Sequence, residues 1–175
     1  MEVMLREYTE ADAAAVLRLN AESVAVLSSM DGARFRALAA MADMLQVAEV
    51  AGQVVGFLMA FTDGRAYDSV NYRWFAARLK RFLYIDRVVL DPSYRGAGLG
   101  TRFYQRAEQY ARAAGLAWLV AEVDVVPPNR VSLAFHDRRG FVEVDRQAAG
   151  GGKMVSLRVR SLGAEPSAAA DGPRA

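Results

Sequence analysis

A glycine-rich turn, residues 95–100 (RGAGLG), has the composition of an anion-binding site. Ordered glycine is entropically costly, so three glycines in five positions indicate strained backbone or a close approach to another group. The turn precedes a stretch with helical spacing, and N–H groups at a helix start attract anions. A turn that merely starts a helix would look the same. The candidate phosphate-binding residues are Arg95, Gly96, Ala97, Gly98, Leu99, Gly100 and Thr101.

Three kinds of phosphate-binding turn compete for this segment. A Walker P-loop is excluded because no lysine precedes Thr101. A dinucleotide fingerprint needs G-x-G-x-x-G, whereas the glycines here are spaced G-x-G-x-G, although Glu122 on the next strand would suit a ribose hydroxyl. The third pattern, [QR]-x-x-G-x-[GA] between a strand and a long helix, matches in full.

Few side chains along the predicted core are suited to proton transfer. Asp86 interrupts the apolar run FLYIDRVVL, where a carboxylate buried without purpose would be expensive. Strand alternation would place Tyr84, Asp86 and Val88 on one face, and Ile85, Arg87 and Val89 on the other. The alternative is that Asp86 only pairs with a neighbouring arginine. The sole histidine is His136.

The elements that must position these residues follow from hydrophobic periodicity and turn signals. We expect strands at residues 1–8, 46–50, 53–61, 82–90, 117–125, 141–146 and 153–160. We expect helices at residues 9–24, 33–45, 99–114 and 130–139. This mixture predicts an α/β domain over residues 1–160, with a mixed central sheet of about seven strands and about four flanking helices. Residues 161–175 lack apolar periodicity and are predicted to be a disordered tail.

Composition restricts the class of protein. The 175 residues, 53% hydrophobic and 24% charged, suit one soluble domain. No apolar run is long enough for a membrane span, the N-terminal residues do not resemble a signal peptide, and cysteine is absent. We therefore expect a cytoplasmic protein without membrane contact, disulfides or a thiol nucleophile.

Charge is concentrated in the middle of the chain. Residues 73–112 contain nine Lys/Arg and three Asp/Glu, a local excess of +6 against +2 for the whole chain. A basic region around the glycine turn favours an anionic ligand, although a solvated basic face would look the same. No nucleic-acid-binding signature appears, so we expect no nucleic-acid partner.

Two longer runs resemble a known family. YIDRVVLDPSYRGAGLGTRFYQRAEQYARAAG resembles the cofactor-binding core of the GNAT family, the acyl-CoA-dependent N-acyltransferases, and NRVSLAFHDRRGFVEV resembles its second motif. The predicted element order also fits the family fold, so the resemblance covers residues 1–160. YDSVNYRWF, FLYIDRVV, EVDVVPPN and SLAFH further resemble a subgroup of bacterial predicted acetyltransferases without an assigned substrate.

The resemblance implies acetyl-CoA as the acyl donor and no metal. Residues 95–101 would bind the pyrophosphate, and a nearby arginine, such as Arg102, the 3′-phosphate. The remaining cofactor contacts implied are the backbone of Val88, Val89 and Leu90 along the pantetheine arm, and Asn129 and Ser132 at its end. The side chains of the valines would also pack in the core.

The implied chemistry is attack of an amine on the thioester, which needs a group to remove a proton from the amine. Asp86 is the first choice for this base and Glu122, with Asp124 two residues on, the second; Tyr84 is an auxiliary donor. His136 stands where many family members have a tyrosine that protonates the departing thiolate. A packing histidine is the alternative.

The resemblance leaves the acceptor unidentified. Polar and aromatic residues of the first helix and of residues 63–80 are the candidates: Asn20, Glu22, Ser69, Asn71, Tyr72, Trp74 and Phe75. They would suit a small-molecule or peptide amine, acetylated by direct transfer in a ternary complex. A non-catalytic acyl-CoA-binding regulatory module and an adenine-nucleotide binder remain rival interpretations. Family members are often dimers, which leaves a homodimer open.

Overall fold

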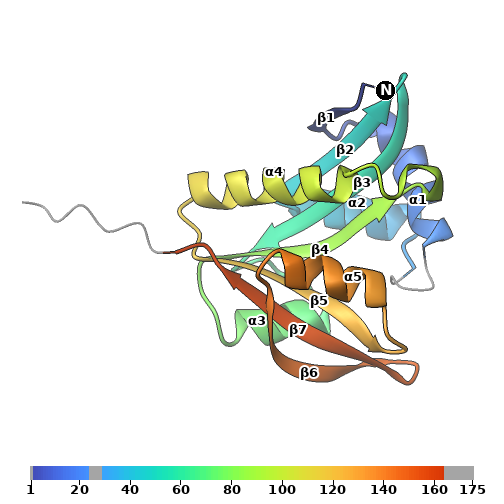
Figure 1. The fold of residues 1–175 in the computed structure, drawn as a ribbon. Coiled ribbons are helices and arrows are strands. Elements are labelled where there is room, and N and C mark those ends of the chain that lie inside the picture. Colours follow the sequence, from blue (N-terminus) through green and yellow to red (C-terminus); the bar gives the residue numbers. More distant parts are fainter. Residues whose placement is uncertain (1, 24–28, 164–175) are drawn as a thin grey trace, which may run out of the picture.

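A mixed β-sheet forms the centre of the protein (Figure 1). The computed structural model describes residues 2–23 and 29–163. The strands are β1 (Met4–Glu7), β2 (Met44–Val50), β3 (Gln53–Thr62), β4 (Phe82–Leu90), β5 (Trp118–Val126), β6 (Val142–Gly150) and β7 (Lys153–Ser161). The α-helices are α1 (Ala13–Glu22), α2 (Gly32–Met41), α3 (Val70–Ala76), α4 (Leu99–Ala113) and α5 (Arg130–Arg138).

The strand order is β1-β2-β3-β4-β5-β7-β6, and only the central β4–β5 pair is parallel. Tight turns join β2 to β3 and β6 to β7, whereas the parallel strands need the crossover through α4. β3 is buried on both faces between β2 and β4, which explains its nearly continuous apolar sequence.

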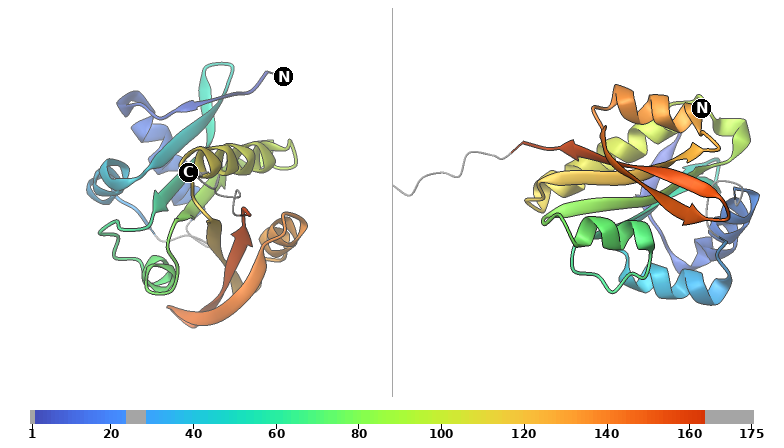
Figure 2. Two further views of the ribbon diagram at one scale, coloured as in Figure 1. Left: turned by 90° about the vertical axis from the view of Figure 1, so that its left-hand side faces the viewer. Right: turned by 90° about the horizontal axis from the view of Figure 1, so that it is seen from below.

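Two hydrophobic cores lie on opposite faces of the sheet. Helices α1, α2 and α3 cover one face, with Phe35, Tyr72 and Phe75 among its buried side chains. Helix α4 covers the other face with one apolar stripe, including Leu99 and Phe103. Figure 2 (right) shows α1–α3 on one side of the sheet and α4 and α5 on the other.

A β-bulge at Asp86 corrects the predicted alternation of β4. Met59 of β3 pairs with Arg87, but the next residue, Ala60, pairs with Ile85, so Asp86 is an extra residue in β4. An extra residue reverses the order in which side chains alternate. Thus Tyr84 lies in the core beside α1–α3 before the bulge and Val89 lies there after it. The bulge is what lets the adjacent Asp86 and Arg87 meet on one face.

The predicted elements are otherwise close to those observed. The unpredicted element is α3, within the segment expected to be irregular. The second helix ends at Met41, not residue 45, because Met44 already starts β2. Leu162 is buried and its N–H donates to the carbonyl of Ala117, so ordered structure continues beyond the predicted boundary at residue 160. Residue 24 of the first helix and residues 164–175 of the predicted tail lie outside the described residues.

Candidate active site

The two parallel strands separate in the middle of the sheet. β4 and β5 pair at Phe82–Trp118, Leu83–Leu119 and Tyr84–Val120, and the pairing stops there. Beyond this point the strands diverge toward the end of the sheet where α4 begins (Figure 1). On the side of β5, the C-terminal half of β4 therefore pairs with no described strand.

Alternate residues of β4 present their main-chain groups to this unpaired edge. The N–H of Asp91 donates to Val55 of β3 at 2.8 Å, so Val89, two residues earlier, also points its main-chain groups toward β3. Val88 and Leu90 must then point theirs away from β3, toward the unpaired edge, and these residues are more exposed than Val89. Of the three residues predicted to align a pantetheine arm, Val88 and Leu90 are suitably oriented and Val89 is not.

The glycine turn leads into the uncapped start of α4. Gly96 and Gly98 have φ values of 79° and 78°, which other residues rarely adopt. Among the described residues, no side chain caps the helix at Gly98. The first N–H groups of α4, those of Leu99, Gly100 and Thr101, therefore remain available to an anion.

The space around the turn also suits a phosphate group. A Cβ atom on Gly96 or Gly98 would meet no protein atom within 4 Å, and the segment from Arg95 to Gly98 is exposed. The glycines are thus needed for backbone conformation, and the surface above them is open. The turn therefore combines free N–H groups with an accessible surface, as an anion-binding site requires.

Arginines beside the turn differ from the one predicted. Arg102 donates to the carbonyl of Val3 at 3.0 Å. Arg139, at the end of α5, donates to the hydroxyl of Thr101, and its guanidinium lies 3.7 Å from the centroid of the Phe135 ring. Arg139 forms no salt bridge among the described residues. Its position makes it a better candidate than Arg102 for a cofactor phosphate.

His136 is held as a neutral ring. Its Nδ1 donates to the Ser132 carbonyl at 2.7 Å, so Nε2 accepts from the Tyr104 hydroxyl at 2.7 Å. Burial lowers the pKa of His136 to about 4. Both ring nitrogens are already hydrogen-bonded, and the ring is neutral near pH 7. The geometry therefore favours a structural role for His136 over that of leaving-group acid. Asn129 caps α5 by accepting from the N–H of Ser132.

Asp86 is fully engaged in a buried network. Its carboxylate accepts from Arg87 Nε at 2.5 Å and from the Tyr67 hydroxyl at 2.5 Å. Arg87 also donates to Asn20 of α1 at 2.7 Å. The side chains of Asp86 and Arg87 are only 5% and 3% exposed. This is the ion pair that the sequence left as the alternative, and a carboxylate so well supplied with donors is a poor general base.

Glu122 on β5 receives fewer hydrogen bonds than Asp86 does. Its Oε1 accepts from the Tyr84 hydroxyl at 2.8 Å, while its Oε2 is buried and receives no hydrogen bond of ordinary geometry from the described residues. Burial, followed by the charge of Asp86, raises the pKa of Glu122 to about 8, although Tyr84 and the nearby Asn71 amide oppose the shift. A carboxyl group that titrates near neutral pH is suited to accept a proton.

The predicted acceptor residues do not form one pocket. Asn71 lies beside Glu122, and Asn20 contacts Arg87. Tyr72 and Phe75, however, are fully buried core residues, and the Tyr72 hydroxyl donates to the carbonyl of Thr62. The other three have local roles. Ser69 caps α3, Glu22 forms an exposed ion pair with Arg18, and Trp74 packs beneath Arg78.

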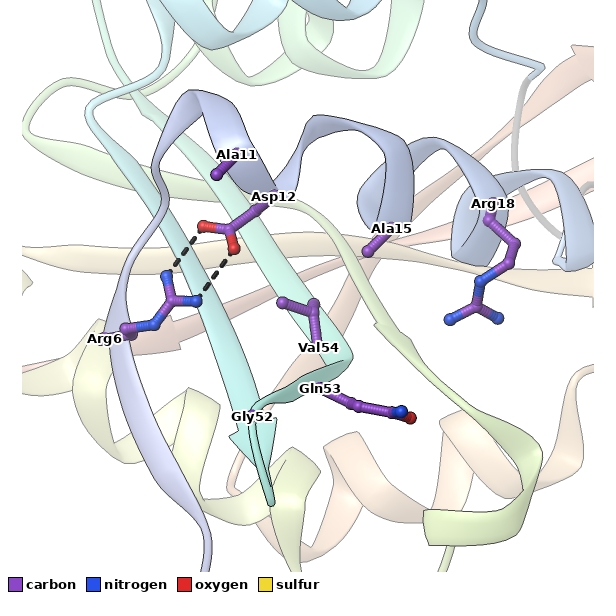
Figure 3. Close-up of a pocket in the computed structure, with 8 residues that line it drawn as sticks. All are labelled: Arg6, Ala11, Asp12, Ala15, Arg18, Gly52, Gln53 and Val54. Carbon is purple, nitrogen blue, oxygen red and sulfur yellow. Dashed lines mark hydrogen bonds and ion pairs between the residues drawn. The ribbon is translucent and has the colours of Figure 1, made fainter.

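A separate hollow of about 300 Å³ lies between β1, α1 and the β2–β3 turn (Figure 3). None of its lining residues belongs to β4 or β5. Its most prominent feature is the ion pair of Arg6 with Asp12, which lowers the pKa of Asp12 to about 2. This pair ties β1 to the start of α1, so it has a structural use.

Four residues of the site were not anticipated: Tyr67, Tyr104, Arg139 and Gln147. Gln147 of β6 donates from Nε2 to Asn71 Oδ1 at 2.6 Å. Each becomes apparent only through contacts between segments far apart in the sequence.

Within the described residues, no helix combines the length and apolar character needed to cross a membrane.

Comparison with known proteins agrees with the fold. Residues 13–141 match the acetyltransferase (GNAT) family, and the chain therefore belongs to this family. It is 31% identical to an uncharacterized N-acetyltransferase of Methanocaldococcus jannaschii over 98 residues, which are 55% of this chain and 38% of that protein. It is 36% identical to an IAA acetyltransferase of Azospirillum brasilense over 59 residues, 34% of this chain and 37% of the relative. The chain thus spans less than two fifths of either relative.

Solved structures share the fold at low sequence identity. Ard1 from Thermoplasma volcanium superposes with a TM-score of 0.76 at 18% identity, covering 92% of this chain and 98% of that one. YncA from Salmonella typhimurium, solved with its cofactor acetyl-CoA, gives a TM-score of 0.70 at 21% identity, covering 93% and 95%. The seven-stranded sheet with its five helices is therefore the GNAT fold.

Proposed function

We propose that this protein is an N-acetyltransferase that moves the acetyl group of acetyl-CoA to a primary amine of a small molecule or peptide. The observation that carries the proposal is the separation of β4 from β5 beyond Tyr84, which leaves main-chain groups of β4 unpaired on that side among the described strands. The uncapped start of α4 lies on one face of the sheet, and the Glu122 carboxylate lies on the opposite face. Cofactor and acceptor can thus meet from opposite faces of the sheet.

The cofactor side is assigned to main-chain groups. The N–H groups of Leu99, Gly100 and Thr101 would bind the pyrophosphate, assisted by Arg95 and by the Arg139 guanidinium. Main-chain groups of Val88 and Leu90 would pair with the pantetheine arm, and an N–H on this edge would polarise the thioester carbonyl. Acetyl-CoA itself supplies the activated acetyl group.

Glu122 is assigned as the general base. Its Oε2 takes a proton from the acceptor amine, the amine nitrogen bonds to the thioester carbon, and the carbon–sulfur bond breaks. Asp86 contributes indirectly, because its charge helps to raise the pKa of Glu122. The sequence contains no cysteine to carry an acyl group, which favours direct transfer. A thiol with an ordinary pKa of about 8.5 can leave as the thiolate, so protonation by His136 is not required.

Calorimetry and thiol release test the two halves of this proposal. We expect acetyl-CoA to bind, and thiol to be released with at least one member of a panel of amines, amino acids and peptides. Glu122→Gln should bind acetyl-CoA normally and lose about 100- to 10,000-fold in turnover. Glu143→Gln, the same change on an outer strand, should retain both properties.

Three results would contradict the proposal. Absence of binding would remove the cofactor assignment. Binding without release for any amine would favour a regulatory acyl-CoA-binding module instead. Unchanged turnover in Glu122→Gln would remove the assignment of the base.

A further inference from the structure

An amide–amide hydrogen bond connects the outermost hairpin of the sheet to the neighbourhood of Glu122. Gln147 is the only residue of β6 that is not exposed. It pairs with Val155 of β7, whose side chain lies in the core beside α1–α3, so both side chains point to that face. From there Gln147 donates to Asn71 Oδ1 at 2.6 Å, across 76 residues of sequence.

The direction of this hydrogen bond determines which group of the Asn71 amide, the donor or the acceptor, is left to interact with Glu122. An asparagine side chain has one acceptor oxygen and one donor NH₂ group. Because the oxygen is occupied by Gln147, the NH₂ group is the one left for Glu122. A donor stabilises the ionised carboxylate, and Asn71 does lower the pKa of Glu122. The reverse orientation would present an oxygen to the carboxylate and repel its charge.

We propose that Gln147 is a positioning residue, which fixes the orientation of the Asn71 amide so that Asn71 donates to Glu122. The inference rests on the proposed function in so far as Glu122 is the base. Without Asn71, burial and the charge of Asp86 would be opposed by Tyr84 and by backbone groups alone. A larger fraction of Glu122 would then be protonated near neutral pH and unable to accept a proton from the acceptor amine.

The first readout does not depend on turnover. The Glu122 carboxyl is titrated by carbon-13 NMR in the cofactor-free protein. Asn71→Ala should raise its pKa by about one pH unit, the size expected for one hydrogen bond to a charged group. Gln147→Ala should raise the pKa in the same direction, and Gln147→Glu, which can only accept and so reverses the Asn71 amide, should raise it at least as far.

The second readout is the pH profile of kcat/KM for acetyl transfer. Its acid limb should move upward with the carboxyl pKa, so the rate below that pKa should fall about tenfold for a shift of one unit. Gln105→Ala, the same substitution at an exposed position of α4, is the matched control and should move neither readout. Circular dichroism verifies that each variant is folded.

A double variant tests whether Gln147 acts through Asn71. The profile of Asn71→Ala with Gln147→Ala should equal that of Asn71→Ala alone. The inference is overturned if Gln147→Ala leaves the Glu122 pKa unchanged, or if its effect persists in the absence of Asn71. If the carboxyl pKa moves but the rate profile does not, Gln147 positions Asn71 as inferred and the assignment of Glu122 as the base is wrong.

Discussion

Replacing Glu122 by glutamine should change how the stability of the fold depends on pH. In the folded protein, burial and the Asp86 charge raise the pKa of this carboxyl from 4.5 to about 8. The folded state therefore holds the proton more tightly than the unfolded chain. The contribution of Glu122 to stability is fully present below pH 4.5 and is lost as the pH rises through 8. Glutamine has nearly the same shape but cannot ionise.

The magnitude follows from the size of the pKa shift. Each pH unit over which the folded state alone keeps its proton changes the free energy of unfolding by about 1.36 kcal/mol. Between pH 6 and pH 9 about two such units are crossed, so the wild type should lose about 3 kcal/mol relative to Glu122→Gln. Titrating groups that do not interact with Glu122 contribute equally in both proteins, so their contributions cancel in the difference.

Urea denaturation at several pH values measures this difference directly. Plotted against pH, the two free energies of unfolding should run nearly parallel below pH 5. Between pH 6 and pH 9 they should diverge, because the free energy of the wild type falls faster. Parallel curves across this range would mean that the carboxyl is not buried in the folded protein. Glu122 would then not be a base that titrates near neutral pH.

Three further predictions concern other parts of the site. Gly98→Ala should weaken acetyl-CoA binding in calorimetry, because φ of 78° strains any other residue at the start of α4; Gly52→Ala carries the same strain in the β2–β3 turn and should leave binding intact. Asp86→Asn should lower the free energy of unfolding, measured in urea, by about 3 to 5 kcal/mol, because Arg87 loses its buried partner. If this variant instead lost turnover while its stability was unchanged, Asp86 would again be the candidate for the base. The NMR signals of His136 should not titrate between pH 5.5 and 9, since its pKa is lowered to about 4, and a midpoint near 6.5 would show a ring able to act as an acid.

Local sequence predicted most of the elements and indicated the cofactor side of the proposed site. Apolar periodicity and turn signals located the helices and their ends, because these signals act within a few residues along the chain. The glycine turn indicated an anion-binding helix start for the same reason. Helix α3 was missed since it is short, rich in aromatic residues and without a regular apolar stripe.

The catalytic side was decided by tertiary structure. One bulge in β4 reversed the alternation of side chains and brought Asp86 onto the face of Arg87, which no periodicity argument anticipates. The environments of Glu122, His136 and Gln147 depend on partners supplied by other strands and helices. The residue types in the sequence identify the groups that can carry protons. Their proton affinities are set by burial and by neighbours that only the folded chain brings together.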